Sequence, residues 1–392
     1  MTTREDPGMT GWSLVGSTLL VRRFSRDSKH EDKACFFEPR TKIAAFDLDS
    51  TLISTRSGEL YASDEQDWKW WHKSVPMKLA ELYDNDYQII IFTNQGRLTD
   101  ENRQEAPEAQ MWKRKVDVLL NVLDIPLILY AACANDNYRK PRTGMWEKMK
   151  EEFHSVELDL SFLVGDAAGR ECDHSDADRH FCLNIGIPFF TPEKFFLGAP
   201  LEPMSDKFNP AWYLPTHTAL ATKRNINHGP KHQSLLVFVG APGAGKTTYY
   251  RKTLQPLGYE RIGSHQLGLE ERVQLAYQVL AEGKSVVIDD TNTTAAARKL
   301  WISLASRFKI RVYAIHFTTP ADLCLHNDSV RALGGDQTKE EQRKVFPRTR
   351  FKDIISRFSE PQNTEGFEEV VKLDFEWHGS SEELRIWNKH WI

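Results

Sequence analysis

The first part of this chain is built around the sequence Ile43-Ala44-Ala45-Phe46-Asp47-Leu48-Asp49-Ser50-Thr51. A short apolar run that ends in polar residues is typical of a strand buried on both faces. Two carboxylates, on Asp47 and Asp49, follow the run where the strand is expected to end. Ligands of open α/β sheets bind beyond the carboxyl ends of the strands. The sequence therefore predicts a buried strand with a polar site directly after it.

The same pattern recurs along the chain. Further apolar runs, with segments of helical periodicity between them, lie at residues 88–92, 127–132 and 160–164. Strands that alternate with helices predict a parallel sheet covered by helices on both faces. A second series of apolar runs lies at residues 235–239, 285–288 and 310–315. We therefore expect an α/β protein in which a doubly wound parallel sheet is followed by a second parallel α/β sheet.

The length of 392 residues also favours two domains. Prolines and a polar, basic stretch separate the two α/β patterns, and such residues interrupt regular structure. We expect a linker there. The predicted order is an N-terminal extension that packs on the first domain, the first domain, the linker and the second domain, at residues 1–40, 41–200, 201–233 and 234–392.

The composition excludes several classes of protein. Hydrophobic residues make up 40% and the formal net charge is −4, so any nucleic-acid contact should use local basic patches, which suits a short end. Five cysteines without a C-x-x-C pair indicate neither a zinc site nor a disulfide framework, which points to a reducing compartment. The sequence has no apolar stretch of about 18 residues and no signal segment at its start, so we expect neither membrane spanning nor secretion.

Polar residues near the other apolar runs complete a candidate site for phosphoryl transfer. Thr93 follows the second run, Lys140 lies in a loop after the third, and Asp166 follows the fourth. A carboxylate such as Asp47 can attack phosphorus and divide one difficult displacement into two easier ones. A second carboxyl group, on Asp49, can protonate the leaving oxygen and later activate water. A hydroxyl, an ammonium group and Mg²⁺ held by carboxylates would neutralise the phosphoryl group.

The chain resembles the haloacid-dehalogenase phosphatase superfamily in four motifs, Asp47-x-Asp49-x-Thr51, Thr93, Lys140 and Gly165-Asp166. The resemblance implies that Asp47 is the nucleophile and Asp49 the general acid and base. It implies that Thr93 and Lys140 bind the phosphoryl group. It also implies that Asp47, Asp166 and the main-chain carbonyl of Asp49 hold Mg²⁺. A lone D-x-D is common in loops after strands, but four motifs in this order are hard to obtain by chance.

A candidate phosphate-binding loop opens the second part. The sequence Gly240-Ala241-Pro242-Gly243-Ala244-Gly245-Lys246-Thr247 fits G-x-x-x-x-G-K-[ST] after a strand. Its glycines let backbone N–H groups turn toward phosphate oxygens. We expect ATP to bind to Gly240, Gly243, Gly245, Lys246, Thr247, Thr248 and Arg331, and Mg²⁺ to bind to Thr247. Asp289 or Asp290, at another strand end, would meet the metal or orient the acceptor, and the alternative is an N-cap of the next helix.

The two parts together resemble the polynucleotide kinase 3′-phosphatase family of DNA-end-repair enzymes. The resemblance rests on stretches that are longer than catalysis requires, at residues 47–58, 139–146, 165–170, 177–179 and 184–188. It implies 3′-phosphatase activity on DNA ends and ATP-dependent phosphorylation of 5′-hydroxyl ends, in a nuclear protein that we expect to be a monomer. Some family members carry a forkhead-associated domain before the phosphatase. Residues 1–40 are too few for one, so we expect it to be lacking.

The kinase motif departs from the family pattern. The family places an Arg-Asp pair before a Leu-Gly, and that Asp takes the proton from the 5′-hydroxyl. Here Ser264 and His265 occupy the two positions, and Ser329 stands where the family has an arginine. A neutral histidine can act as a base near pH 7, so His265 is the candidate, but it lacks a carboxylate's charge. We predict that the second domain binds ATP but phosphorylates poorly or not at all.

Three alternatives stay open at this point. The chain could be a 3′-phosphatase whose P-loop half is a degenerate nucleotide- or DNA-binding module, which the Ser264-His265 pair favours. It could be a non-catalytic scaffold at DNA breaks, which the complete phosphatase motifs oppose. It could be a small-molecule phosphatase fused to a metabolite kinase, which the long family stretches oppose. Two basic stretches, 68–73 and 343–352, are candidate DNA contacts, and the alternatives are core packing and a solvated face.

Overall fold

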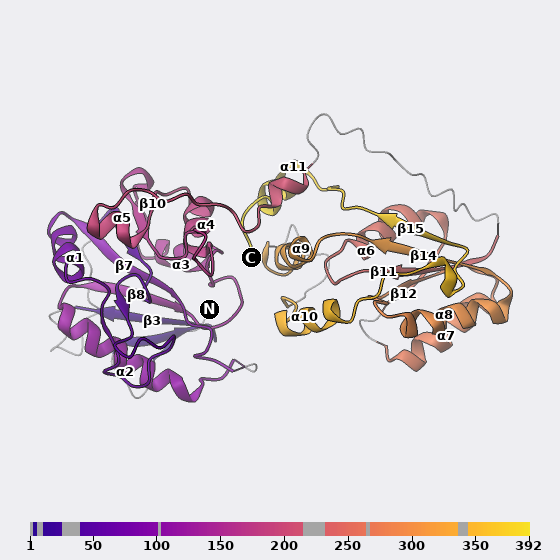
Figure 1. Cartoon of the computed structure of the whole chain (residues 1–392), viewed down its shortest axis with the longest axis horizontal. Coiled ribbons are helices and arrows are strands. Elements are labelled where there is room, and N and C mark those ends of the chain that lie inside the picture. The colour runs from indigo at the N-terminus through magenta and orange to yellow at the C-terminus, as the bar shows by residue number, and fades with distance from the viewer. Residues whose placement is uncertain are drawn as a thin grey trace. The chain divides into compact units, whose positions relative to one another are not determined.

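The computed structural model describes residues 3–5, 11–25, 40–100, 103–214, 232–263, 267–335 and 344–392. The chain divides into two compact units, each drawn with its own sheet in Figure 1. Unit 1 comprises Met1–Asn209 together with His390–Ile392, and unit 2 comprises Pro210–Lys389. Within the described ranges, no helix is both long enough and apolar enough to cross a membrane.

Unit 1 contains an eight-stranded sheet with the order β1-β2-β3-β8-β7-β4-β9-β10. The strands of this sheet are β1 (Thr3–Glu5), β2 (Trp12–Val15), β3 (Leu19–Phe24), β4 (Lys42–Phe46), β7 (Tyr87–Asn94), β8 (Leu127–Ala132), β9 (Phe162–Val164) and β10 (Phe189–Phe190). From β8 to β10 the strands run parallel, as the alternating pattern predicted. At the β8 edge, β1, β2 and β3 add antiparallel pairs. A separate small pair consists of β5 (Ile53–Ser54) and β6 (Lys69–Trp70).

Helices cover both faces of this sheet because its strands are apolar on both sides. The helices of unit 1 are α1 (Val75–Asp84), α2 (Pro107–Leu123), α3 (Gly144–Lys150), α4 (Ala177–Ile185) and α5 (Pro192–Leu197), with a 3₁₀ turn η1 (Leu158–Leu160). Along β4, Ala44 and Phe46 pack with α1 and α2 in one core, and Ile43 and Ala45 pack with α3 and α4 in the other. The strand is thus buried on both faces, as predicted.

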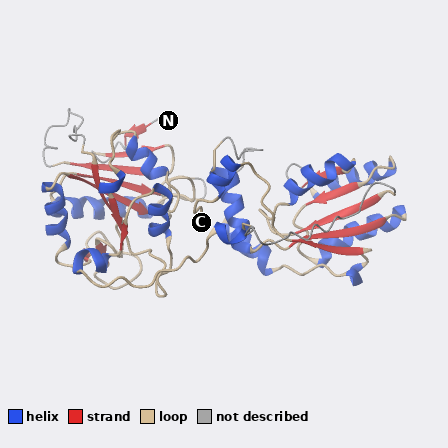
Figure 2. Cartoon of the chain, turned by 90° about the horizontal axis from the view of Figure 1, so that it is seen from above, coloured by secondary structure: helices blue, strands red, loops and turns tan. Residues whose placement is uncertain are grey.

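Unit 2 contains a five-stranded parallel sheet with the order β12-β13-β11-β14-β15. Its strands are β11 (Ser234–Val239), β12 (Glu260–Gly263), β13 (Val286–Asp289), β14 (Arg311–Phe317) and β15 (Glu369–Leu373). Its helices are α6 (Lys246–Tyr249), α7 (Leu269–Ala281), α8 (Ala295–Phe308), α9 (Ala321–Leu333), α10 (Arg348–Ser356) and α11 (Ser381–Trp387). Short turns complete it, η2 (Pro210–Tyr213), η3 (Tyr250–Leu254), η4 (Gln255–Leu257) and η6 (Asn363–Glu365). Helices α7 and α8 share one core with the sheet, and η3 and α9 share the other. Figure 2 shows the helices and strands of each unit in a second view.

The N-terminal extension, the linker and the last three residues each compare differently with the expected domain order. Residues 12–24 extend the sheet of unit 1, in the strands β2 and β3. Most of the expected linker lies outside the described residues, since 215–231 are not described. The last three residues, which we expected in the second domain, belong to unit 1.

Candidate active site

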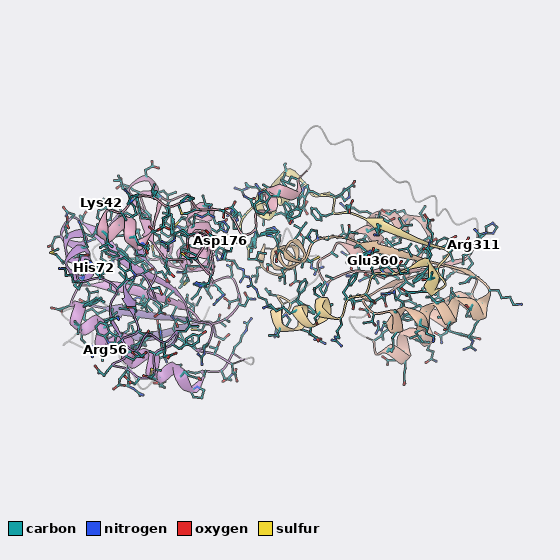
Figure 3. The ribbon with its side chains drawn as sticks, viewed as in Figure 1. Lys42, Arg56, His72, Asp176, Arg311 and Glu360 are labelled. Carbon is teal, nitrogen blue, oxygen red and sulfur yellow. The ribbon has the colours of Figure 1, made fainter. Side chains whose placement is uncertain are left out.

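Three strand ends bring the predicted phosphatase residues to one edge of the sheet in unit 1. β4 lies between β7 and β9, so Asp47, Thr93 and Asp166 come from neighbouring parallel strands. The backbone N–H of Asp47 donates to the carbonyl of Val164, at 2.9 Å, which ties the end of β4 to the end of β9. On the same side of the sheet lies the loop between β9 and α4, where Figure 3 labels Asp176. Lys42, also labelled in Figure 3, stands at the opposite, amino end of β4.

Lys140 reaches this edge from the loop between β8 and α3. Its Nζ lies 2.6 Å from Oδ1 of Asp47 and 2.6 Å from Oδ1 of Asp178, and it donates to the carbonyl of Phe92 at 2.6 Å. Burial acts to lower the pKa of Lys140, but the carboxylates of Asp178 and Asp47 raise it overall. The lysine is therefore a buried, charged ammonium group directly beside the proposed nucleophile.

Asp178 holds Lys140 in place. This carboxylate is buried, and it also accepts a hydrogen bond of 3.1 Å from the backbone N–H of Ala167. The loop passes so close that a Cβ on Gly165 would lie 2.4 Å from Oδ2 of Asp178, so glycine is required there. Asp178 lies in the family stretch 177–179, but the sequence did not indicate that it pairs with Lys140.

Asp47, Asp166 and Asp178 form a dense acidic cluster. Each offers a carboxylate oxygen, and these oxygens lie within 4.8 Å of one another. Burial and the two neighbouring carboxylates raise the pKa of Asp47 well above its usual range, against the opposing effect of Lys140. Burial, with Asp178 close by, raises the pKa of Asp166 to about 6. Three carboxyl groups thus crowd around one ammonium group, which disfavours their ionised forms, and their oxygen donors suit a hard divalent cation such as Mg²⁺ that would offset the repulsion.

Asp49 stands at the more open side of the cluster. Its side chain is 53% exposed, and Oδ1 lies 3.7 Å from Nζ of Lys115. Gln95 Nε2 donates to Oδ2 of Asp49 at 2.7 Å and also contacts Oγ1 of Thr93 at 3.0 Å. The structure therefore brings together all five predicted phosphatase residues and adds Gln95, Lys115 and Asp178. No sequence motif identified Gln95 or Lys115.

The aromatic and basic stretch 68–73 is partly core. Trp68 is buried and packs edge-on against Trp70, with ring centroids 5.3 Å apart. Lys69 between them is exposed. This packing favours the core interpretation for Trp68.

In unit 2 the phosphate-binding loop lies between β11 and α6. Lys246 is buried, which lowers its pKa, and its Nζ donates to the carbonyls of Gly240 and Ala241 at 2.8 and 2.6 Å. Thr247 Oγ1 donates to Oδ2 of Asp289 at 2.8 Å. Lysine, threonine and aspartate therefore meet at the carboxyl ends of β11 and β13.

Three further predicted residues of unit 2, Asp289, Asp290 and Arg331, each pair with an oppositely charged side chain. Asp289 also accepts from Nε of Arg261 at 2.6 Å, and Asp290 pairs with Arg272 at 2.5 Å. Neither caps α8, because the N-cap of that helix is Thr294. Arg331 is on α9 and pairs with Asp328 at 3.0 Å.

The remaining predicted residues of unit 2 are either placed by their element alone or lie outside the described residues. Gly243 and Gly245 lie in the loop, and Thr248 is in α6. The candidate base His265 and its neighbour Ser264 lie outside the described residues, as does Arg343 in the basic stretch 343–352.

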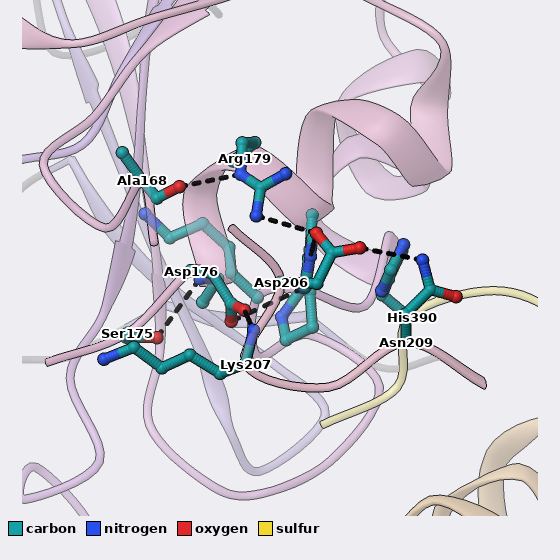
Figure 4. A network of polar contacts seen from close by, with 12 residues as sticks. Ala168, Ser175, Asp176, Arg179, Asp206, Lys207, Asn209 and His390 are labelled. Carbon is teal, nitrogen blue, oxygen red and sulfur yellow. Dashed lines mark hydrogen bonds and ion pairs between the residues drawn. The ribbon is translucent and has the colours of Figure 1, made fainter. Parts of the chain in front are cut away.

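A polar network fixes the loop that precedes α4 (Figure 4). Arg179 Nε donates to the carbonyl of Ala168 at 2.7 Å, and its Nη2 contacts Asp206 Oδ1 at 2.8 Å. Asp206 also contacts Nε2 of His180 at 3.0 Å. The ring of His390, from the end of the chain, stacks on His180 with ring centroids 3.6 Å apart. The C-terminal residues are thus part of the wall of unit 1 close to this loop.

Unit 1 is an α/β unit with the candidate phosphatase residues at the carboxyl ends of its parallel strands, and unit 2 is a parallel α/β unit with a glycine-rich phosphate-binding loop after its strand β11. Residues 42–196 match the family model described as polynucleotide kinase 3 phosphatase, and residues 235–361 match an AAA domain model. A bifunctional polynucleotide phosphatase/kinase of Schizosaccharomyces pombe is 38% identical over 373 residues, which cover 93% of this chain and 84% of that relative. The chain belongs to the family of bifunctional polynucleotide phosphatase/kinases.

Two further relatives each match less than half of the chain. A polynucleotide 3′-phosphatase of Arabidopsis thaliana is 37% identical over 177 residues, which cover 41% of this chain and 25% of that relative. A polynucleotide 3′-phosphatase of Saccharomyces cerevisiae is 27% identical over 208 residues, which cover 40% of this chain and 87% of that relative. The relatives named as phosphatases alone thus each cover about two fifths of the chain.

Proposed function

We propose that unit 1 removes the 3′-phosphate from DNA ends through an aspartyl-phosphate formed on Asp47. The observation that carries this proposal is the partly buried contact of 2.6 Å between Asp47 and Lys140 at the carboxyl edge of the sheet. Thr93 and Asp166 end the strands on either side of Asp47. Residues 42–196 match the polynucleotide kinase 3 phosphatase model, and two relatives that match about two fifths of the chain are named polynucleotide 3′-phosphatases, which supports the substrate class.

The reaction has two steps. In the first, a carboxylate oxygen of Asp47 attacks phosphorus, and the P–O3′ bond breaks as Asp49 gives its proton to O3′. In the second, water attacks the phospho-aspartate, Asp49 takes the proton, and phosphate leaves. Lys140 neutralises charge on the phosphoryl group throughout. Mg²⁺ would be held by Asp47, Asp166 and the carbonyl of Asp49, and it supplies charge that offsets the repulsion between carboxylate and phosphate.

Unit 2 binds ATP and Mg²⁺ in this proposal. Lys246 would reach the phosphates, and Thr247 with Asp289 would meet the metal. We expect slow phosphorylation of 5′-hydroxyl ends, because Ser264 and His265 replace the Arg-Asp pair of the family. By family resemblance the protein works in the nucleus as a monomer. A 3′-phosphatase with a degenerate P-loop half is the second candidate, and the same replacement favours it.

One oligonucleotide tests both halves of the proposal. It carries a 3′-phosphate and a 5′-hydroxyl and is incubated with Mg²⁺ and ATP, and each end is assayed separately. We expect Asp47→Asn to reduce 3′-phosphate release by about 10³-fold or more, the scale of losing a nucleophile. Lys246→Ala should leave that release unchanged and abolish any transfer to the 5′ end. Full release of the 3′-phosphate by Asp47→Asn would refute the phosphatase mechanism. Rapid transfer of phosphate from ATP to the 5′ end, lost in Lys246→Ala, would refute the prediction that the kinase is slow.

A further inference from the structure

Helix α2 turns a buried lysine toward the phosphatase site. Lys115 is 5% exposed, and Trp112 and Leu119, about one turn away on either side, are buried as well. An ammonium group in such a position is unfavourable unless it has a partner. A methionine would fill the same space without that desolvation penalty. The charge of Lys115, not its volume, is therefore the feature that needs an explanation.

The partner of this lysine is the proposed general acid. Nζ of Lys115 lies 3.7 Å from Oδ1 of Asp49, and within the described part of the chain no other polar partner of this ammonium group is found. The other oxygen of Asp49 accepts the hydrogen bond from Gln95. The two carboxylate oxygens are thus held from two separate elements, α2 and the end of β7. Without these contacts a side chain as exposed as that of Asp49 would be free to turn into solvent.

A second buried lysine on α2 provides the contrast. Lys113 is 1% exposed, and its Nζ donates to both carboxylate oxygens of Glu105, each at 3.2 Å. The ammonium group of Lys113 thus pairs with Glu105 and not with Asp49. The same helix therefore buries one lysine in a pair with a glutamate outside the motif set and another against a motif residue.

We infer that Lys115 is a positioning residue of the phosphatase reaction, which keeps the Asp49 carboxyl group beside the oxygen that leaves phosphorus. The inference rests on the proposed function. It adds a residue from α2 that none of the four motifs contains. Lys115 itself makes no bond to the substrate and acts through Asp49.

The chemistry assigns this role to a definite step. As the bond between Asp47 and phosphorus forms and the P–O3′ bond breaks, the proton of Asp49 passes to O3′, leaving a neutral 3′-hydroxyl and an Asp49 carboxylate. In the second step the oxygen of a water molecule bonds to phosphorus, and a proton of that water passes to Asp49. The bond between Asp47 and phosphorus then breaks and phosphate is released. An Asp49 that points away would slow the departure of a poor leaving group most. A sugar alkoxide is a poor leaving group, whereas p-nitrophenolate leaves without a proton.

The test compares two substrates in Lys115→Met and in the matched control Lys113→Met. For an oligonucleotide 3′-phosphate, we expect Lys115→Met to reduce kcat by about 10- to 100-fold with little change in KM. For p-nitrophenyl phosphate, the same variant should lose no more than about threefold. Lys113→Met should change both substrates by the same factor. Lys115→Arg, which keeps the charge, should recover part of the kcat.

A double-mutant cycle separates positioning from other roles. In an Asp49→Asn background, Lys115→Met should cause no further loss on the oligonucleotide, because the group that it positions is already gone. Equal losses on both substrates, additive losses in the cycle, or a higher KM for the oligonucleotide alone would each overturn the inference. Lys115→Gln serves as the second variant if Lys115→Met does not fold.

The outcome for the proposed function is distinguishable from the outcome for this inference. If wild-type protein releases phosphate from neither substrate, or if Asp47→Asn stays active, the proposed function fails. The proposed function stands if the wild type is active and Asp47→Asn is not. If Lys115→Met and Lys113→Met then show the same ratio of kcat on the oligonucleotide to kcat on p-nitrophenyl phosphate, only the role of Lys115 is wrong.

Discussion

The ammonium group of Lys140 lies between two carboxylates, and this position gives a single residue influence over both stability and activity. The carboxylates of Asp47 and Asp178 each lie 2.6 Å from Nζ. Removing one partner from a buried ion pair leaves uncompensated charge, which is more damaging than never having had the pair. Lys140 is therefore expected to matter for folding as well as for binding phosphate.

We predict that Lys140→Met abolishes phosphatase activity and lowers the free energy of unfolding of unit 1 by about 3 kcal/mol at pH 7.5. Urea denaturation followed by tryptophan fluorescence measures the loss. Adding Asp178→Asn should recover part of it, because one of the two stranded carboxylates is then neutral. The control is Lys150→Met, which removes an exposed lysine paired with Glu147 at 2.8 Å and should change stability by less than about 1 kcal/mol.

At the scale of an element, the phosphate-binding loop is constrained by the helix behind it. Gly243 has φ +84°, and a Cβ there would lie 2.1 Å from the carbonyl oxygen of Cys324 in α9. Gly245 has φ +93°, but a Cβ there would meet nothing within 4 Å. Both glycines adopt a backbone conformation that L residues disfavour. Only at Gly243 would a side chain also force the loop away from α9.

We predict that Gly243→Ala disrupts unit 2 more than Gly245→Ala does. The left-handed backbone alone should cost about 1 kcal/mol in each variant. The clash with a backbone carbonyl should add about 2 kcal/mol or more for Gly243→Ala, with loss of ATP binding, because the loop must shift away from α9. Binding of a fluorescent ATP analogue and the melting temperature of unit 2 measure the difference. Equal effects would show that the contact with Cys324 does not constrain the loop.

At the scale of the whole molecule, the chain ends in the unit in which it began. Asn184 Nδ2 donates to the carbonyls of His390 and Pro141, at 2.7 and 2.9 Å. Arg142 Nε donates to the carbonyl of Trp391 at 3.0 Å. The C-terminal residues therefore support the loop that carries Lys140, although unit 2 precedes them in the sequence.

The contribution of His390 to the stability of unit 1 should fall as the pH drops from 7.5 to 5.5. Burial, with His180 beside it, lowers the pKa of His390 to about 4. Below its ordinary value of about 6.5, the unfolded chain binds a proton that the folded chain does not, so the folded state is favoured less. After allowance for partial exposure, we expect a loss of about 1 kcal/mol over this interval. The loss should level off below pH 4, where both states are protonated.

Chemical denaturation at the two pH values checks this prediction against His390→Phe. Phenylalanine keeps an aromatic ring beside His180 but cannot be protonated, so the variant should lose less stability between pH 7.5 and 5.5 than the wild type. The same pH dependence in both proteins would assign it to other groups.

The sequence by itself determined the parallel strands of both sheets and the strand ends that carry Asp47, Thr93 and Asp166. It could do so because apolar runs and the residues that follow them are local, and the carboxyl ends of parallel strands share one edge. The glycine-rich loop was equally readable, since its backbone demands glycine at fixed spacing.

Only the tertiary structure decided which residues from other segments complete the site. Asp178 reaches Lys140, Lys115 reaches Asp49, and His390 stacks on His180, each from a distant part of the chain. Lys115 and Lys113 look alike in sequence, as two lysines on one amphipathic helix. Their partners differ because packing aims each ammonium group at a different carboxylate, and contacts between distant segments leave no local pattern to read.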